Sequence, residues 1–414
     1  MHSKELDNGL KIVVVPRQED QSVTVEICGL AGSAHEAEAA GAAHFLEHLL
    51  FDGTKNYPEI DKLDEIVSKK GSRKNGMTNK DFVRYFVKSL PEEIESSFLY
   101  LSEIIINPLL RSRDIDREKT IIEQEINRFK DDPSLYLPRK VYSSLYPDSP
   151  LGRFVTGDVD EVMNLNKEDI EKFWEKNYCA KNFVLVVAGD TNEEKVFNLA
   201  KKYFSKMKSG ERREVITQQP NTKKVILSEQ RDKLKQAHTI VNFFGPQNGS
   251  EDTYPLNVAI KILSRGFGSR LYSKLRTEKA MIYSLINYLR QFSFGGTVGI
   301  VTAFEENRLN EGLAIIKTEL EKMANEEVAD EELFKGISIA LSDDLFNSEL
   351  NEELTRIYAY NLLTTGNIVL PEESKNKYKD VSKKDVMRIS GEIFLQNPKI
   401  LTVTNSTLSR DIVY

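Results

Sequence analysis

The stretch Gly41–Gly53 reads GAAHFLEHLLFDG and contains His44, Glu47 and His48 in the order H-x-x-E-H. The chain of 414 residues has five histidines, and two of them stand four positions apart here. Wound as an α-helix, the stretch places these three side chains on one side, and the opposite side carries Phe45, Leu46, Leu49 and Leu50. We therefore predict a helix with one core face and one face that presents two imidazoles and a carboxylate.

This arrangement of side chains is typical of a zinc site. Two histidines one helical turn apart can bind the same Zn²⁺ ion, and a glutamate beside them can act as a general base. Read from N to C, the order is the inverse of the H-E-x-x-H motif. A catalytic zinc ion normally has three protein ligands and an open position for water, so a further ligand is expected elsewhere in the chain.

The predicted helix 112–130 offers candidates for that ligand. Its residues Glu118, Ile121, Ile122 and Glu125 recur at i, i+3, i+4 and i+7 and form one stripe, whereas Glu123 points elsewhere. Burial of an unpaired carboxylate is costly, so acids on an apolar face usually meet a metal or another cation. From the residues alone, Glu125 or Glu118 is the candidate, and two ordinary carboxylates at the edge of the face are the alternative.

Length and composition narrow the class of protein. A chain of 414 residues is too long for one core, and its 40% apolar content is ample for burial. The net charge of −7 is dispersed, which argues against nucleic acid or an anionic membrane surface as the partner. Cys28 and Cys179 lie far apart and suggest neither a disulfide framework nor a thiolate metal site. No membrane span or targeting segment is recognised, so a cytoplasmic location is expected.

The order of predicted elements suggests a duplication. Two halves of about 200 residues each mix strands and helices in a similar order, which predicts an α+β fold of two duplicated domains, each a mostly antiparallel sheet packed with helices. The polar stretch 207–222 is the expected linker between domains 1–210 and 223–414. Strands are predicted at 10–15, 23–27, 82–89, 183–188, 225–228, 238–244, 283–289, 297–302 and 400–403, and helices at 57–70, 91–106, 112–130, 167–177, 192–205, 253–263, 269–279, within 307–365 and at 383–393.

The motif GAAHFLEHLLFDGT, followed 77 positions after His48 (48 to 125) by Glu125 in EKTIIEQEI, resembles the pitrilysin-type zinc metallopeptidases. That family includes insulysin and the mitochondrial processing peptidases. The resemblance covers essentially the whole chain and implies that Glu125 is the third ligand of one Zn²⁺ ion per chain, with Glu118 supporting the site from behind. It also implies that Glu47 is the general base and that the two domains enclose a cavity.

Two further motifs match the family. Asn75-Gly76-Met77-Thr78, with Tyr85 after it, resembles the family's edge strand, N-A-x-T…Y, where the substrate peptide is held by main-chain pairing. The chain departs from that pattern with Gly76 for Ala, Asp81 for Glu and Val83 for Thr. In the second half, Arg276 and Tyr283 resemble the family's R…Y pair, which contacts the substrate backbone and the reacting carbonyl. An Arg and a Tyr seven positions apart would mean nothing by themselves.

The resemblance implies a zinc-dependent endopeptidase that cleaves peptides or unfolded segments held in extended form. Because the chain carries both the zinc motif and the R…Y pair, it is expected to be catalytically self-sufficient, and a homodimer is the expected assembly. A dedicated presequence-processing peptidase is the alternative within the enzymes. From another class, the alternative is a non-catalytic scaffold subunit, although such subunits typically lose parts of the zinc motif that are intact here. Cleavage preference and the physiological substrate are not predicted. His2, His35 and His238 are expected to be structural or exposed.

Overall fold

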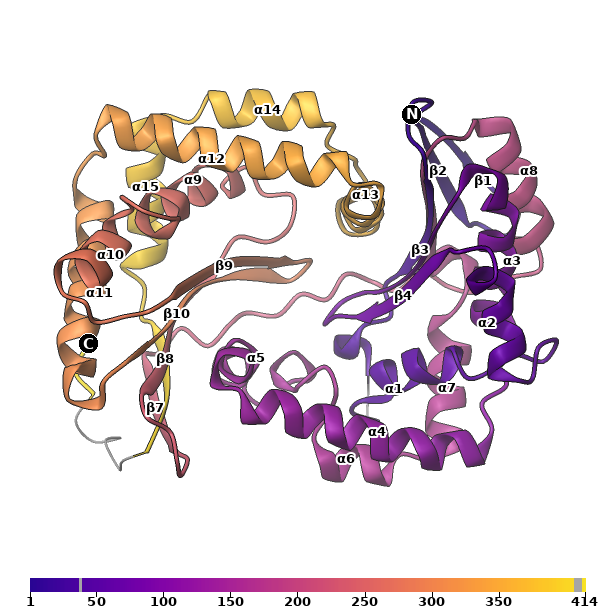
Figure 1. Cartoon of the computed structure of the whole chain (residues 1–414), viewed down its shortest axis with the longest axis horizontal. Coiled ribbons are helices and arrows are strands. Elements are labelled where there is room, and N and C mark those ends of the chain that lie inside the picture. Colours follow the sequence, from indigo (N-terminus) through magenta and orange to yellow (C-terminus); the bar gives the residue numbers. More distant parts are fainter. Residues whose placement is uncertain (37–38, 406–411) are drawn as a thin grey trace. The chain divides into compact units, whose positions relative to one another are not determined.

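Two β-sheets, each with helices on both faces, organise the chain (Figure 1). The computed structural model describes residues 1–36, 39–405 and 412–414. Within them the chain divides into two compact units. Unit 1 comprises 1–127, 153–216 and 347–369, and unit 2 comprises 128–152, 217–346 and 370–414. In the described part of the chain, no helix is long and apolar enough to cross a membrane.

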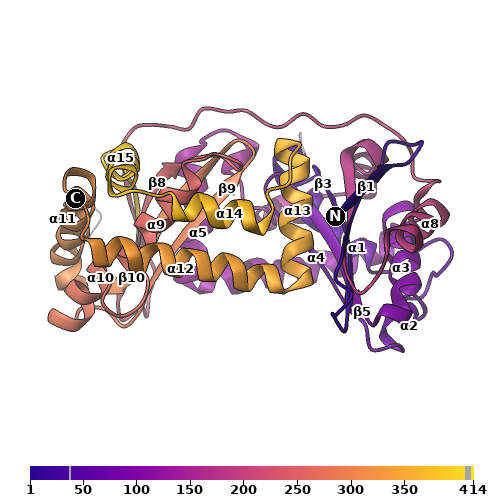
Figure 2. The same cartoon turned by 90° about the horizontal axis from the view of Figure 1, so that it is seen from above.

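Unit 1 is built on a six-stranded sheet in the order β1-β2-β6-β3-β5-β4. All neighbouring strands are antiparallel except β2 and β6. Helix α13 packs on one face of this sheet, and α3 and α8 cover the other (Figures 1 and 2). Its elements are β1 (His2–Glu5), β2 (Lys11–Pro16), β3 (Val23–Gly29), α1 (Ala42–Leu50), α2 (Ile60–Ser68), β4 (Arg73–Thr78), β5 (Val83–Ser89), α3 (Ile94–Ile106), most of α4 (Ser112–Asp131), α6 (Val159–Asn164), α7 (Lys167–Asn177), β6 (Phe183–Gly189), α8 (Glu193–Phe204) and α13 (Asn351–Thr365).

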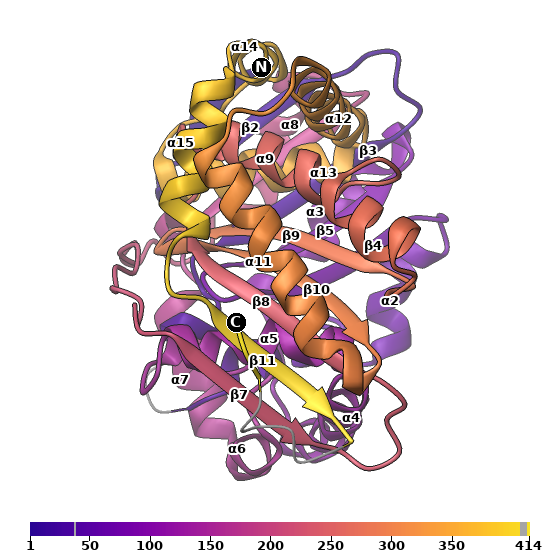
Figure 3. The same cartoon turned by 90° about the vertical axis from the view of Figure 1, so that its left-hand side faces the viewer.

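Unit 2 is built on a five-stranded sheet in the order β7-β11-β8-β10-β9. Helices α11 and α15 lie in front of this sheet in Figure 3, and α5 lies behind it. Its elements are α5 (Pro133–Leu145), β7 (Val225–Gln230), β8 (Ala237–Gly245), α9 (Thr253–Ser264), α10 (Arg270–Tyr272), the π-helical turn η5 (Ser273–Glu278), β9 (Leu285–Phe292), β10 (Gly295–Phe304), α11 (Leu309–Asn325), most of α12 (Asp330–Glu349), α14 (Pro371–Lys379), α15 (Lys383–Phe394) and β11 (Lys399–Thr404).

The two sheets share one topology. Strands β2-β6-β3-β5-β4 of unit 1 correspond in order to β7-β11-β8-β10-β9 of unit 2, and in each sheet only the first of these pairs is parallel. The next elements also correspond, because α1 follows β3 as α9 follows β8, and the 20-residue helices α4 and α12 follow at equivalent places. The predicted duplicated α+β fold is confirmed.

Each unit contains one helix from the other half of the sequence. The contiguous domains predicted at 1–210 and 223–414 do not include this exchange. Helix α5 comes from the first half and packs on β8, β10 and β11, whereas α13 comes from the second half and packs on β3 and β6. The reason is burial: one face of the first sheet carries Val13, Val184 and Val186, and α13 covers it with Leu354, Tyr358 and Leu363. The expected linker 207–222 contains neither helix nor strand, and the chain passes from unit 1 to unit 2 at 216–217.

Some elements are absent from the predicted list, and each has a local reason. Helix α5 begins at Pro133 and has Pro138 in its interior, a residue that normally interrupts a helix because it lacks an N–H. Helix α14, with sequence PEESKNKYK, is too polar to show a helical apolar period. Strand β1 is exposed along its whole length and is held by pairing with β2.

An ion pair joins α9 to α12 in unit 2. The ammonium group of Lys261 lies 2.9 Å from Oδ2 of Asp343. The helices approach closely here, because a Cβ added to Gly336 of α12 would stand 2.8 Å from Cγ1 of Ile262. Asp343 lies 13 residues after the first residue of α12 (330 to 343), and Glu125 lies 13 residues after the first residue of α4 (112 to 125). The ion pair therefore occupies a place in the duplicated fold that corresponds to the predicted metal ligand.

We expect Lys261→Met to lower the free energy of unfolding by about 1 kcal/mol, measured by urea denaturation. The Lys261 side chain is 14% exposed and that of Asp343 34%, so solvent screens the pair only in part. The matched control is Lys274→Met, which removes the solvent-exposed pair with Glu278 in the same unit and should leave the midpoint unchanged. Equal midpoints for the two variants would contradict a stabilising role of the Lys261–Asp343 pair.

Candidate metal centre

The motif helix α1 is held at its N-terminus by a buried carboxylate. Glu36 accepts hydrogen bonds from the backbone N–H groups of Gly41 at 2.9 Å and Ala43 at 2.8 Å. These groups have no partner within the helix, and the helix dipole favours negative charge at this end. Burial raises the pKa of Glu36 to about 8, although the two N–H groups oppose that rise. Gly41 has φ of 86°, and an added Cβ would stand 2.8 Å from the carbonyl oxygen of Thr156, so both conformation and space favour glycine.

Helix α1 buries the face that the sequence predicted. Phe45, Leu46, Leu49 and Leu50 are all at most 1% exposed, and the helix packs on α7. Burial of side chains of this size contributes roughly 1.5–3 kcal/mol each, which holds the helix in a single rotation about its axis. The opposite face is therefore fixed with the two imidazoles turned toward α4.

Three predicted ligands come together between α1 and α4. Nε2 of His44 and Nε2 of His48 each lie 3.6 Å from Oε2 of Glu125. One ligand atom from each residue lies within 4.8 Å of the others. Among the described residues, these three form the one group of His, Cys, Asp or Glu side chains that could hold a metal ion. His44 is buried, His48 is half-buried and Glu125 is exposed. Two sides of the cluster are thus enclosed and one is open.

The donor set fits a zinc ion, and the two His–Glu separations are close to those that such an ion requires. Two atoms that each lie about 2.0–2.1 Å from a tetrahedral zinc ion are roughly 3.3 Å apart, and both His–Glu separations here are 3.6 Å. Two neutral imidazoles and one carboxylate are a typical catalytic ligand set that leaves a fourth position open.

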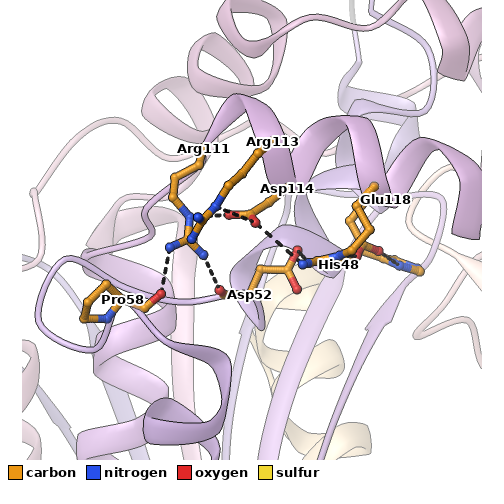
Figure 4. A network of polar contacts seen from close by, with 8 residues as sticks. His48, Asp52, Pro58, Arg111, Arg113, Asp114 and Glu118 are labelled. Carbon is orange, nitrogen blue, oxygen red and sulfur yellow. Dashed lines mark hydrogen bonds and ion pairs between the residues drawn. The ribbon is translucent and has the colours of Figure 1, made fainter.

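Glu118 orients the second histidine from behind. Its Oε2 lies 3.0 Å from Nδ1 of His48 (Figure 4). The other ring nitrogen, Nε2, therefore faces Glu125. A carboxylate that receives the outer N–H of a ligand histidine fixes its tautomer and ring orientation. Glu118 is itself held by Arg117, whose Nε lies 3.2 Å from Oε1. For His44, the outer nitrogen Nδ1 is buried and has no hydrogen-bond partner among the described residues.

A charged network ties the start of α4 to the end of α1. Arg117 also approaches Oδ2 of Asp52 at 2.6 Å, and Arg111 donates to the backbone oxygens of Asp52 at 3.0 Å and Pro58 at 2.8 Å (Figure 4). Arg111 is also paired with Asp114, one turn before Glu118. These contacts connect the loop after α1 to α4. They therefore fix the position of the α4 carboxylates along α1.

The pKa shifts follow from burial and from these neighbours. Burial lowers the pKa of His44 to about 4, against the attraction of Glu125. Burial would also lower the pKa of His48, but its contacts with Glu118 and Glu125 outweigh burial and raise it to about 10. Burial and nearby Glu118 raise the pKa of Asp52 to about 7, although Arg117 opposes the rise. The two imidazoles thus shift in opposite directions, and a bound cation would compete with a proton for the cluster.

Glu47 lies on the same helix and faces strand β4. Its Oε2 accepts a hydrogen bond of 2.6 Å from the hydroxyl of Thr78, and Oε1 lies beside Gly76, where an added Cβ would stand 3.1 Å from it. Burial raises the pKa of Glu47, and the hydrogen bond from Thr78 opposes that rise. A carboxyl whose pKa is moved toward neutrality is suited to proton transfer near neutral pH.

Strand β4, which holds Asn75 and Gly76, is the edge of the first sheet. It pairs with β5 so that Gly76 faces Tyr85 and Thr78 faces Val83. Tyr85 is buried and shares a hydrogen bond of 2.7 Å with the hydroxyl of Tyr178, so it supports the strand from the sheet interior.

Arg276 and Tyr283 lie together in unit 2. The Arg276 guanidinium lies 4.9 Å from the centroid of the Tyr283 ring and 5.3 Å from that of Tyr272, and it donates to the Tyr283 backbone oxygen. Tyr283 is 83% exposed, so its hydroxyl is accessible. Among the other histidines, His35 and His238 are half-buried, and partial burial lowers the pKa of His35 to about 4.

Several contacts escaped the sequence analysis. Thr78 was part of the quoted edge-strand motif, but nothing in its spacing indicated a bond to Glu47. Glu36, Asp52 and Arg117 stand among many other charged residues, and no periodicity separates them from solvated side chains. The structure alone brings them to the site.

Two family models match the chain. Residues 11–159 match the model described as insulinase (peptidase family M16), and residues 164–339 match the model described as peptidase M16 inactive domain. The first match contains the His44, His48 and Glu125 cluster, and the second contains Arg276 and Tyr283.

The chain is also similar over nearly its whole length to named zinc proteases. A protein of Rickettsia felis described as an uncharacterized zinc protease is 28% identical over 94% of either chain. The zinc protease PqqE of Helicobacter pylori is 26% identical over 95% of this chain and 90% of its own. A crystal structure of a protease from Helicobacter pylori superposes with a TM-score of 0.90 at 24% identity, covering 97% of this chain and 99% of its own. A chain of complex III from Candida albicans has a TM-score of 0.85 at 16% identity, covering 98% and 96%. These two structures show the shared fold.

We expect Glu118→Gln to weaken zinc binding about 10- to 100-fold, because the amide cannot hold the His48 N–H as a carboxylate does. Competition with a chromophoric chelator measures the dissociation constant. Glu123→Gln, on the same helix but outside the cluster, is the matched control and should bind zinc as the parent does. Equal affinities for the two variants would remove Glu118 from the support of the site.

Proposed function

Because the chain belongs to the insulinase family of peptidases, M16, we propose that it is a zinc-dependent endopeptidase that hydrolyses peptides or unfolded segments held in extended form. The observation that carries this proposal is the convergence of His44, His48 and Glu125 beside Glu47. Two ligands and a carboxyl suited to proton transfer come from one nine-residue helix, and the third ligand comes from α4.

The roles follow from the chemistry of each group. Zn²⁺ held by His44, His48 and Glu125 would supply a Lewis acid for the scissile carbonyl and lower the pKa of a water molecule. Glu47 accepts the proton of the attacking water and delivers it to the nitrogen of the leaving amine. Glu118 keeps the His48 ring turned with Nε2 toward the cluster.

Strand β4 is suited to hold the substrate backbone. As an edge strand it pairs with β5 along one side, so the N–H and C=O groups of its other side remain for an added strand. Asn75 and Gly76 lie in this strand next to Glu47, and they would place an extended peptide beside the general base. Recognition through the main chain tolerates many side chains, which agrees with a peptidase of broad specificity.

Arg276 and Tyr283 are proposed to act on the substrate from unit 2. The Tyr283 hydroxyl is a donor suited to the negative charge that develops on the carbonyl oxygen, and Arg276 supplies fixed donors for the peptide backbone. The contact of the Arg276 guanidinium with the Tyr283 ring supports a joint role, because one side chain limits the motion of the other. The homodimeric assembly remains a prediction.

A scaffold role is the alternative from another class, since the fold is shared with a chain of complex III. Three ligand residues in place and a general base beside them favour the enzyme. Hydrolysis of unrelated fluorogenic peptides, abolished by a chelator and restored by zinc, separates the two functions. Cleavage restricted to a presequence peptide would favour the dedicated processing peptidase instead.

We expect Glu47→Gln to retain zinc and fold but to lower kcat by about 10²–10⁴-fold, because an amide cannot accept the proton of water. Peptide hydrolysis and zinc stoichiometry are measured on the same preparation. Glu125→Ala is the complementary variant and should lose bound zinc, because a ligand is removed. Full activity of Glu47→Gln would overturn the mechanism, and unchanged zinc content in Glu125→Ala would exclude Glu125 as a ligand.

We expect Tyr283→Phe to lower kcat by about 10²-fold, because the ring and its contact with Arg276 are kept while the hydroxyl donor is lost. Tyr272→Phe is the matched control, since the Tyr272 ring also lies beside the Arg276 guanidinium but is given no part in the reaction. Steady-state hydrolysis of one peptide by both variants decides the role. A Tyr283→Phe variant as active as Tyr272→Phe would remove the hydroxyl from the mechanism.

A further inference from the structure

Thr78 lies where the edge strand meets the motif helix. It is the last residue of β4, and its position is set by the pairing with Val83 of β5. Since strand pairing fixes the backbone of Thr78, its side chain has few ways to turn. The hydroxyl is directed at α1 and donates to Oε2 of Glu47 at 2.6 Å, a short hydrogen bond to a carboxyl oxygen.

The other side of the Glu47 carboxyl group is bounded by Gly76. A Cβ at position 76 would stand 3.1 Å from both Cγ and Oε1 of Glu47 and 3.0 Å from the ring of Phe51. The glycine thus leaves the space that Glu47 occupies, and Thr78, two residues further along the same strand, binds one of its oxygens. Both contacts come from a single strand whose register on β5 is fixed.

We propose that Thr78 is the positioning residue for Glu47. Its hydroxyl binds Oε2 of Glu47, and Oε1 takes the proton. This inference rests on the proposed function, in which Glu47 is the general base. A glutamate side chain has three rotatable bonds, and without a partner it would distribute its carboxyl group over several orientations. The hydrogen bond from the Thr78 hydroxyl, beside a second one from the Thr78 backbone, removes most of that freedom.

The proposal predicts an effect on turnover rather than on substrate binding. A base that is misplaced by about 1 Å can cost up to roughly 10²-fold in rate, while the affinity for the peptide backbone along β4 is unaffected. A purely structural role in the strand predicts no loss of turnover in the valine variant. Valine has a high preference for strands and nearly the same shape as threonine, so Thr78→Val would be tolerated if only the strand mattered.

The experiment compares Thr78→Val with Thr78→Ser on one fluorogenic peptide, with zinc content measured for each. We expect Thr78→Val to bind one zinc ion, to keep KM within about twofold and to lose about 10- to 100-fold in kcat. Thr78→Ser keeps the hydroxyl and is expected to recover kcat to within about threefold of the parent. A Thr78→Val variant with the parent kcat, or a Thr78→Ser variant as slow as Thr78→Val, would overturn the proposal.

A second measurement does not depend on activity. In the metal-free protein, Thr78→Val is expected to raise the unfolding equilibrium constant about fivefold in the parent and less than twofold in the Glu47→Ala background, because the bond is already lost there. Equal effects in both backgrounds would show that the two residues are not coupled and would overturn the proposal. If the zinc-loaded parent hydrolysed no peptide, the proposed function would fall, and this cycle alone would decide whether Thr78 holds Glu47.

Discussion

The structure depends on one electrostatic constraint: two imidazoles and a carboxylate must converge within 4.8 Å between two helices. Burial disfavours charge on His44, whereas the two carboxylates beside His48 favour its charged form. The surrounding residues supply the necessary rigidity. Glu36 holds the start of α1, the buried leucines set its rotation, and the Arg111 and Arg117 network fixes α4 beside it. Each contact lies outside the cluster, yet each determines where a ligand atom stands.

The duplicated unit shows what the same helix pair does without that cluster. In unit 2, Lys261 of α9 pairs with Asp343 of α12, which lies as far from the start of its helix as Glu125 does from the start of α4. An ammonium group that belongs to the chain thus meets the carboxylate whose counterpart in unit 1 is Glu125. A fixed positive charge joins the helices without any bound ion.

Strand β4 is both the edge of the first sheet and the strand that contacts Glu47. Its free edge offers main-chain groups to an extended peptide, and its Thr78 and Gly76 border the carboxyl group of Glu47. In the proposed peptidase, the same register on β5 would set both the path of the substrate and the orientation of Glu47. A shift of this strand would change both together. The hydrogen bond between the Tyr85 and Tyr178 hydroxyls in the sheet interior supports that register.

The sequence by itself determined the local features of this protein. The 3.6-residue period around His44 and His48 predicted α1 with its core face, and most strands and helices follow from their own patterns. It also determined which residues could bind a metal, but Glu118 and Glu125 were separable only through the family resemblance. Only the tertiary structure decided the rest. The partners of Glu47 and His48, and the exchange of α5 and α13 between the units, depend on packing between segments far apart in the chain. The spacing of apolar residues along one helix or strand does not indicate such contacts. It shows that a face must be covered, but not which segment covers it.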